Sequence, residues 1–190
     1  MLRDIDAILI DRDRIADRVR AMGEQIAADL LREIGPGASA GQIVFIPILT
    51  GAVVFVADLI RHIPFKLSLG VVAVSSYPGR SLESKGAAIR GDLPRDLAGK
   101  HVVIVDDVLD SGRTLALIRD LVLEQQPASL RIAVLLSKDV AREARVDAEY
   151  VGFSIPDAFV VGYGLDYDGY YRNLPDVATL KPEAIEQTSG

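Results

Sequence analysis

The chain has 190 residues, of which 49% are hydrophobic and 25% are charged, and its formal net charge at pH 7 is −6. This composition is typical of a globular protein with one complete core. An acidic chain is not expected to bind nucleic acid, which usually requires a basic surface. The chain has no cysteine, which excludes disulfide bonds and thiol nucleophiles. No secretory signal or uninterrupted apolar span is visible, so we expect a cytoplasmic protein without membrane contact.

Apolar residues recur every three or four positions near the N-terminus, over residues 11–33. This spacing predicts a long amphipathic helix, which the Gly-Pro-Gly run after it would end. Continuous apolar runs over 43–49 and 65–75 predict two buried strands, with a helix over 52–61 between them. Strands that alternate with helices indicate an α/β fold with a mostly parallel sheet covered on both faces.

Two polar features follow these strands. Thr50 and Gly51 precede a helix N-terminus, where an anion can bind, although an ordinary strand-to-helix turn explains them more simply. Residues 76–91, beginning with Ser76 and Tyr77, are polar, rich in Gly and Ser, and long for a loop in a compact domain. Both a lid over an active site and a flexible hairpin fit this composition.

The centre of the chain holds its most informative stretch. The four β-branched residues at 102–105 form an apolar run without alternation, which predicts a strand buried on both faces. Two acids, Asp106 and Asp107, follow directly. Turn residues at 110–112 come next, and helical spacing of apolar side chains begins at Arg113. The stretch therefore predicts a strand, a polar loop and a helix N-terminus.

The polar loop between that strand and helix can bind phosphate, because the first N–H groups of a helix lack intrahelical partners. Gly112 lets the backbone approach a ligand, and Ser111 and Thr114 add hydroxyl donors. The two acids before the loop suit ribose hydroxyls or a hard cation such as Mg²⁺. A phosphate site beside a site for a diol and a metal describes a ribose 5-phosphate. The simpler alternative, in which these residues only cap the strand and the helix, explains each residue singly but not the whole string.

Four side chains in the C-terminal third are candidate ligand contacts. Lys138 follows a predicted strand at 129–136 and can donate to a carbonyl oxygen, although most lysines in such a place are only solvated. Phe159 can stack on a flat base, Asp166 can reach a metal or ligand, and Arg172 can pair with phosphate oxygens. The alternative is a structural β hood with core aromatics.

The central string resembles the phosphoribosyl pyrophosphate signature of type I phosphoribosyltransferases, and an acid at Asp110 is similar to members that act on 6-oxopurines. Together with the aromatic run at 150–175, it resembles the hypoxanthine-guanine phosphoribosyltransferases. The resemblance implies a Rossmann-like core, in which helices flank a mostly parallel central sheet, with a small hood subdomain and a flexible lid loop. The implied organisation is a single domain over 1–190, with the core at about 40–150, the hood at about 150–180 plus the N-terminal segment, and the lid at about 76–91.

The resemblance also implies an activity and a role for each site residue. Enzymes of this family join a 6-oxopurine to phosphoribosyl pyrophosphate with Mg²⁺, release pyrophosphate and so salvage purines. Asp110 is implied to be the catalytic acid or base beside N7 of the purine. The other implied contacts are Asp106, Asp107, Asp110, Ser111, Gly112, Arg113 and Thr114 for phosphoribosyl pyrophosphate; Thr50, Gly51 and Arg172 for pyrophosphate; Lys138, Phe159, Val160 and Asp166 for the purine; Asp106, Asp107 and Asp166 for the metal; and Ser76 and Tyr77 for the lid.

Thr50 departs from the family pattern. The family commonly has a lysine before this glycine and uses the peptide between the two residues, often in a cis form, to bind pyrophosphate. Threonine keeps the backbone N–H and adds a hydroxyl, but it removes the positive charge. The resemblance further implies small-molecule substrates and a homodimer or homotetramer.

Two alternative functions remain open. A regulator resembling the pyrimidine-operon attenuation proteins shares the Val-Asp-Asp-Val-Leu and Gly-Arg-Thr pieces of the central motif. Asp110, the purine hood at 159–172 and the acidic net charge count against such an RNA-binding protein. A phosphoribosyltransferase that prefers xanthine would differ only in the pocket, and the sequence does not decide between hypoxanthine, guanine and xanthine.

Overall fold

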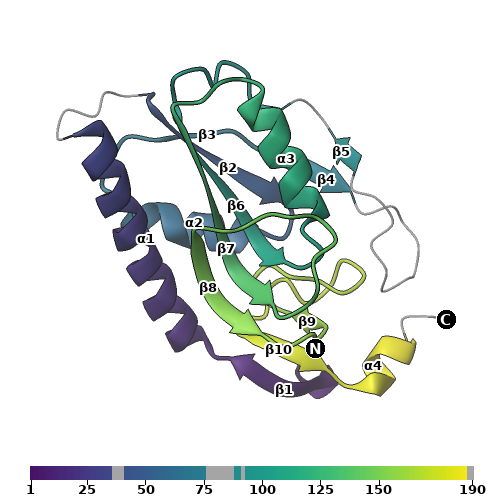
Figure 1. Cartoon of the computed structure of the whole chain (residues 1–190). Helices are drawn as coiled ribbons and strands as arrows, with labels where there is room; N and C mark the ends of the chain where they lie inside the picture. Colours follow the sequence, from purple (N-terminus) through teal and green to yellow (C-terminus); the bar gives the residue numbers. More distant parts are fainter. Residues whose placement is uncertain (36–40, 76–87, 91–92, 188–190) are drawn as a thin grey trace.

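The computed structural model describes residues 1–35, 41–75, 88–90 and 93–187 (Figure 1). Its centre is a seven-stranded sheet in the order β5-β4-β2-β6-β7-β8, with β3 paired to β2 beside this path. Neighbouring strands are parallel except for β4 and β5, which are antiparallel. The strands of this sheet are β2 (Ile43–Leu49), β3 (Ser68–Leu69), β4 (Val72–Ser75), β5 (Ala88–Arg90), β6 (His101–Leu109), β7 (Ser129–Lys138) and β8 (Tyr150–Ile155).

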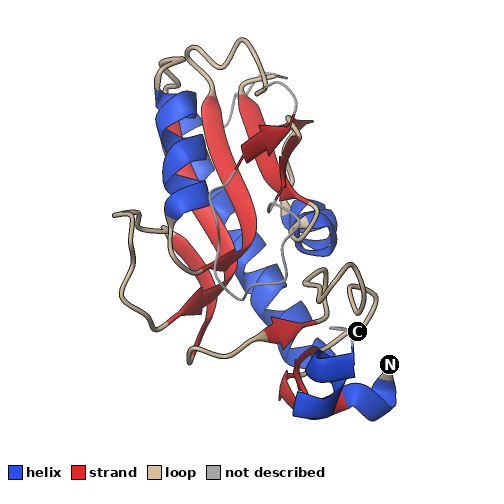
Figure 2. Ribbon diagram, turned by 90° about the vertical axis from the view of Figure 1, so that its right-hand side faces the viewer, coloured by secondary structure: helices blue, strands red, loops and turns tan. Residues whose placement is uncertain are grey.

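Helices cover both faces of the central sheet (Figures 1 and 2). Successive residues of β2 point to opposite faces: Phe45 joins the core cluster under α1 and α2, whereas Val44 and Ile46 join the cluster under α3. This arrangement explains why the strand is an apolar run without alternation. The helices are α1 (Arg12–Ile34), α2 (Val53–Leu59), which continues as the 3₁₀ turn η2 (Ile60–His62), and α3 (Arg113–Leu123).

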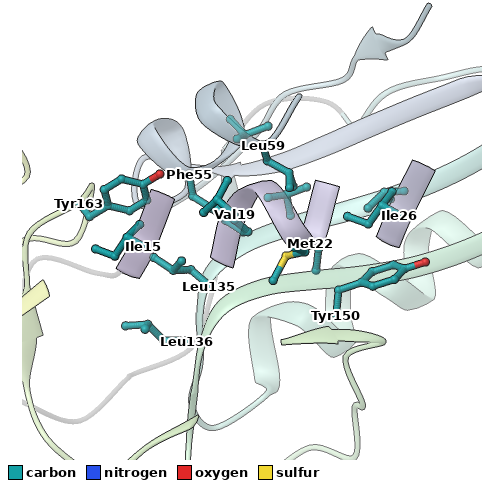
Figure 3. Packing of buried hydrophobic residues seen from close by; sticks show 14 of the residues in the cluster. Ile15, Val19, Met22, Ile26, Phe55, Leu59, Leu135, Leu136, Tyr150 and Tyr163 are labelled. Atoms are coloured by element: carbon teal, nitrogen blue, oxygen red, sulfur yellow. The ribbon is translucent and has the colours of Figure 1, made fainter. Parts of the chain in front are cut away.

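The long helix α1 has the boundaries that the sequence predicts. The carboxylate of Asp11 accepts hydrogen bonds from the backbone N–H groups of Asp13 and Arg14, at 3.1 and 2.9 Å, and so caps the first turn. The apolar stripe of α1 packs on α2 and on the sheet, as Figure 3 shows for Met22 and Phe55. At the other end Gly35 has φ +76°, a value that favours glycine.

A second, antiparallel sheet forms the hood, in the order β1-β10-β9. The N-terminal strand pairs with β10 in this sheet, and Arg12 links the hood to α1 through a 3.0 Å ion pair with the buried Asp176. The hydroxyl of Tyr163 donates to Asp58 on α2 at 2.7 Å, and burial together with this bond raises the pKa of Tyr163. The hood elements are η1 (Leu2–Asp4), β1 (Ile5–Ile10), β9 (Val160–Val161) and β10 (Val177–Leu180), followed by α4 (Pro182–Gln187).

The single strand expected over 65–75 is wrong, because the segment forms two short strands. β3 pairs with the start of β2 and β4 pairs with its end. Between them Pro94 packs against Gly70 so closely that a Cβ at Gly70 would lie 2.3 Å from Pro94 Cγ. The chain therefore bends at the glycine instead of continuing as one strand.

Two other boundaries differ from the expectation. Most of the expected lid, including Ser76 and Tyr77, lies outside the described residues, but Ala88–Arg90 form β5, which pairs with β4. The start of the expected hood, Tyr150–Ile155, is instead β8, the edge strand of the central sheet. It belongs there because α1 covers it: Asp29 accepts a 2.8 Å hydrogen bond from the hydroxyl of Tyr150. Within the described ranges, no helix is long and apolar enough to cross a bilayer.

Candidate active site

A cavity of about 490 Å³ opens where β2 and β6 end and where α2 and α3 begin. Ligands commonly bind at this edge of a parallel sheet, because strand ends and helix N-termini meet there. The cavity walls come from both strands, the turn after β2, the loop after β6, the first turn of α3, one residue of β4 and two hood residues. The lining residues are Ile48, Leu49, Thr50, Gly51, Val74, Asp106, Asp107, Val108, Leu109, Asp110, Ser111, Gly112, Thr114, Leu115, Asp166 and Arg172.

Asp106 and Asp107 lie within β6, which extends to Leu109, rather than after the strand as the sequence suggested. Burial, followed by the neighbouring charge of Asp107, raises the pKa of Asp106 well above its ordinary value. Burial also raises the pKa of Asp107. The carboxylate of Asp107 lies directly against Gly51, where a Cβ would be 1.8 Å from Oδ2. The acid pair is thus a buried, electrostatically unfavourable element of the cavity wall.

The loop that follows β6 brings backbone and hydroxyl donors to the same cavity. Gly112 has φ +78° and precedes the first residue of α3, and no side chain of the described residues caps this helix. Ser111, Gly112 and Thr114 line the cavity beside the acid pair. Arg113 does not line it and instead forms an ion pair with Glu143. The loop therefore presents a helix N-terminus to the cavity, as the sequence predicts, with Arg113 turned to a different partner.

Lys138 lies at the end of β7 and links the loop to the segment after β8. Its Nζ lies 3.0 Å from Oδ2 of Asp110 and 3.3 Å from Oδ1 of Asp157. The Lys138 side chain is 13% exposed and that of Asp110 is 51% exposed. The structure thus brings together the two residues that the family resemblance assigns to purine O6 and N7, although only Asp110 lines the cavity.

The aromatic candidate for base stacking lies apart from the main cavity. Phe159 is 37% exposed and meets Tyr167 edge-to-face, with ring centroids 5.4 Å apart. Val160 is buried and pairs with Thr179 in the hood sheet. Neither residue lines the cavity. The exposed part of the Phe159 ring is available to a ligand without any rearrangement of the core.

Arg172 and Asp166 form the hood side of the cavity. Arg172 pairs with Asp166 at 2.7 Å and donates to the carbonyl of Gly164 at 2.6 Å. Gly164 has φ +104°, and a Cβ there would lie 2.3 Å from the carbonyl oxygen of Gly51. The hood therefore packs directly on the turn after β2. The cis peptide bond in this turn joins Leu49 to Thr50, which corrects the expectation that it would follow Thr50.

The acid pair fits a divalent cation. Carboxylate oxygens are the ligands that Mg²⁺ prefers, and a cation would offset the burial that raises the pKa of both acids. Asp166, the third acid expected at the metal, is paired with Arg172. In the described residues, no three acids or histidines stand close enough together to form a complete metal cluster. Asp106 and Asp107 are therefore the residues best suited to hold Mg²⁺ together with oxygens of a substrate.

Sequence reasoning did not identify three contributors to the site. Asp157 pairs with Lys138, Gly164 packs on Gly51, and residues 139–149 pack on the loop between β6 and α3. The aspartate and the glycine lie inside a segment that the sequence did single out. Residues 139–149 carried no signal, because Glu143 and Ala144 contact Ser111 through their backbone N–H groups.

Comparison with known proteins defines the class. The family model described as "Phosphoribosyl transferase domain" matches residues 12–168. The chain therefore belongs to the phosphoribosyl transferase domain family. Its mostly parallel sheet with flanking helices has the fold of the type I phosphoribosyltransferases. Its similarity is to hypoxanthine-guanine phosphoribosyltransferases, as the sequence motifs predict. That of Mycobacterium tuberculosis H37Rv is 45% identical over 185 residues, which cover 96% of this chain and 90% of the relative.

Another relative and two solved structures that resemble this chain are also hypoxanthine-guanine or hypoxanthine phosphoribosyltransferases. The hypoxanthine-guanine phosphoribosyltransferase of Bacillus subtilis 168 is 38% identical over 98% of this chain and 99% of its own length. The crystal structure of a Bacillus anthracis hypoxanthine-guanine phosphoribosyltransferase with HEPES in its active site has a TM-score of 0.82 and 36% identity, covering 94% of this chain and all of that one. The Trypanosoma cruzi hypoxanthine phosphoribosyltransferase in complex with the product IMP has a TM-score of 0.85 and 32% identity, covering 97% of this chain and 95% of that one.

Proposed function

We propose that this chain is a purine-salvage enzyme that joins hypoxanthine or guanine to 5-phosphoribosyl 1-pyrophosphate, giving IMP or GMP and pyrophosphate. The observation that carries the proposal is one cavity lined by a buried acid pair, a helix N-terminus and Asp110, whose carboxylate pairs with Lys138 outside that cavity. The first group suits a ribose, the second a phosphate and the third a 6-oxopurine. The similarity to hypoxanthine-guanine phosphoribosyltransferases along nearly the whole chain supports this assignment.

The loop after β6 binds the 5-phosphate in this proposal. Backbone N–H groups at Gly112 and Thr114 donate to phosphate oxygens, the hydroxyls of Ser111 and Thr114 add donors, and the dipole of α3 favours the negative charge. Arg113 contributes through its backbone, since its side chain pairs with Glu143. The 5-phosphate then fixes the ribose above β6.

Asp106 and Asp107 hold the ribose hydroxyls and Mg²⁺. A cation held there would supply positive charge beside the oxygens of the leaving pyrophosphate. Arg172 and the backbone of Thr50 and Gly51 bind the pyrophosphate oxygens from the other side. The hydroxyl of Thr50 supplies one more donor where relatives of this type have a lysine. Asp166 orients Arg172 through their ion pair and lines the same cavity as Asp106 and Asp107.

The purine lies between Lys138 and Phe159. Lys138 donates to O6, Phe159 stacks on the ring and the backbone of Val160 meets the edge of the base. The C1′–N9 bond forms as the C1′–oxygen bond to pyrophosphate breaks, and Asp110 takes the proton from N7. Such general base catalysis typically contributes about 10²–10⁴-fold. The fixed arrangement of both substrates removes a further part of the entropic barrier.

The remaining family features follow the same proposal. We infer that residues 76–91 act as a lid that excludes water from the reacting carbon. The enzyme is a cytoplasmic homodimer or homotetramer and binds neither nucleic acid nor membrane. It is one phosphoribosyltransferase domain, whose hood consists of the segments after β8 and before α1.

The test is steady-state turnover of hypoxanthine, guanine, xanthine and uracil, each with phosphoribosyl pyrophosphate and Mg²⁺. We expect conversion of hypoxanthine or guanine. If xanthine is converted fastest, the choice of base would be assigned to the edge of the pocket near Val160. If no base reacts while phosphoribosyl pyrophosphate still binds, the transferase proposal fails and an RNA-binding regulator becomes the better hypothesis.

A further inference from the structure

The connection between the parallel strands β7 and β8 has an unusual form. Parallel neighbours need a crossover, and this is usually a helix. Here the structure describes the whole connection, residues 139–149, and it contains neither helix nor strand. We call this segment the strap, because it crosses the loop between β6 and α3.

The strap holds the Ser111 carbonyl group. The backbone N–H groups of Glu143 and Ala144 both donate to the Ser111 oxygen, each at 3.1 Å. The carbonyl oxygen of Ala144 also approaches Gly112, and it would lie 2.7 Å from a Cβ there. The phosphate loop and the strap therefore meet through backbone atoms, at a position where only glycine fits.

This contact sets the direction of one N–H group. The Ser111–Gly112 peptide bond is trans, since the Leu49–Thr50 bond is the only cis bond in the described chain. In a trans peptide the C=O and the N–H point in opposite directions. Because the strap holds the Ser111 carbonyl on its own side, the N–H of Gly112 points away from the strap, toward the cavity that Gly112 lines.

The strap is itself anchored at several points. Val146 is 2% exposed and packs in the core under α3. Arg142 donates to the carbonyl of Val146 at 3.0 Å and to the hydroxyl of Ser137 at 3.1 Å. Arg119 of α3 donates to the carbonyl of Arg145 at 2.9 Å. These anchors hold the strap as a fixed part of the fold.

We propose that the strap is a positioning element for phosphate binding: Glu143 and Ala144, through their N–H groups, aim the Gly112 N–H at the 5-phosphate of the substrate. The proposal rests on the proposed function, because it assigns the ligand of the loop as a ribose 5-phosphate. The strap follows directly after Lys138, so it also connects the base site to the phosphate site by a short length of chain.

The decisive variant is Ala144→Pro, which removes one of the two N–H donors to Ser111. Titration calorimetry would measure the affinity for ribose 5-phosphate and, separately, for pyrophosphate with Mg²⁺. We expect the affinity for ribose 5-phosphate to fall about 10- to 100-fold, as for a misplaced hydrogen bond to a charged group. The affinity for pyrophosphate, which binds at Thr50, Gly51 and Arg172, should stay unchanged.

Ala141→Pro is the matched control, because its N–H makes no hydrogen bond within the described chain, and it should change neither affinity. Unchanged binding of ribose 5-phosphate to Ala144→Pro would overturn the proposal, as would an equal loss for both ligands or an equal effect of the control. If Ala144→Pro does not fold, Arg142→Ala is the variant that tests the proposal. It should lose affinity for ribose 5-phosphate and not for pyrophosphate, and Arg142→Lys should keep part of that affinity. Ribose 5-phosphate binds without a purine base, so its binding tests the strap separately from the reaction. If the wild type binds ribose 5-phosphate but converts no purine, the proposed function is refuted and the proposed role of the strap is not.

Discussion

Lys138 Nζ lies 3.0 Å from Oδ2 of Asp110, so a cation and an acid stand within one hydrogen bond of each other beside the phosphate loop. A 6-oxopurine carries an acceptor, O6, next to a ring nitrogen, N7, that gains or loses a proton. The pair therefore matches two neighbouring atoms of the base. In the proposed function, a purine bound between them would replace the direct ion pair by two hydrogen bonds, one to each side chain.

The first prediction concerns the proton transfer at Asp110. Asp110→Asn keeps the shape of the side chain but cannot take the N7 proton. We expect kcat to fall about 10²–10⁴-fold, the typical contribution of a general base. The affinity for phosphoribosyl pyrophosphate should fall much less. Steady-state kinetics together with calorimetry would check this, and equal losses in turnover and binding would refute the acid/base assignment.

The second prediction concerns Asp157, the other partner of Lys138. Its carboxylate lies 3.3 Å from Nζ and its side chain is 69% exposed, so the interaction is modest. Exposed ion pairs contribute about 0.2–1 kcal/mol, so Asp157→Asn should raise KM for the purine by about two- to fivefold without changing kcat. Asp17→Asn, an aspartate on α1 whose side chain is 73% exposed, is the control. A fall in kcat would show that Asp157 takes part in the chemistry itself.

The third prediction follows from the buried acid pair. Because burial and Asp107 raise the pKa of Asp106 in the folded protein, the unfolded chain releases this proton more readily. The contribution of Asp106 to the free energy of unfolding is therefore fully present below the ordinary pKa of 3.8, and it is lost as pH rises through the pKa of the folded protein. At neutral pH the buried charge destabilises the fold. Asp106→Asn removes this charge, and we expect it to stabilise the metal-free protein by about 0.5–2 kcal/mol at neutral pH.

Urea denaturation in EDTA at acidic and neutral pH would measure the effect of Asp106→Asn. The gain should shrink toward acidic pH, where the wild-type acid is protonated. Mg²⁺ with phosphoribosyl pyrophosphate should raise the Tm of the wild type more than that of the variant. If the variant is less stable than the wild type at every pH, Asp106 contributes to the stability of the fold rather than to ligand binding.

The central site could be predicted from the sequence because its parts are contiguous. The run at 102–105, the two acids after it and the turn at 110–112 lie in one short stretch, and each has a strong local preference. The sequence therefore predicted the strand–loop–helix arrangement that the structure has, and the phosphate chemistry of the loop stays a prediction. Lys138 required the family resemblance, because nothing local separates it from a solvated lysine.

The parts that sequence reasoning missed depend on approaches between distant segments. The strap binds Ser111 through backbone N–H groups, which carry no sequence signature. The position of β8 depends on which element covers it: helix α1 covers Tyr150, so the strand joins the central sheet instead of the hood. The break between β3 and β4 depends on the packing of Pro94 against Gly70.

The last prediction tests the contact that seats the hood on the turn after β2. Gly164→Ala would place a Cβ 2.3 Å from the carbonyl oxygen of Gly51. The other side of Gly51, where a Cβ would stand, lies against the carboxylate of Asp107. Gly99→Ala is the matched control, since Gly99 also has a left-handed φ, +69°, but no atom of the described chain lies within 4 Å of its Cβ position.

Both alanine variants should lose about 1–2 kcal/mol from the left-handed backbone, and Gly164→Ala should lose about 1–3 kcal/mol more from the clash. Because the clash displaces Gly51, only Gly164→Ala should weaken pyrophosphate binding. Urea denaturation and calorimetry with pyrophosphate and Mg²⁺ would separate the two effects. Equal losses of stability in both variants, with pyrophosphate binding intact, would mean that the turn after β2 holds its shape without the hood.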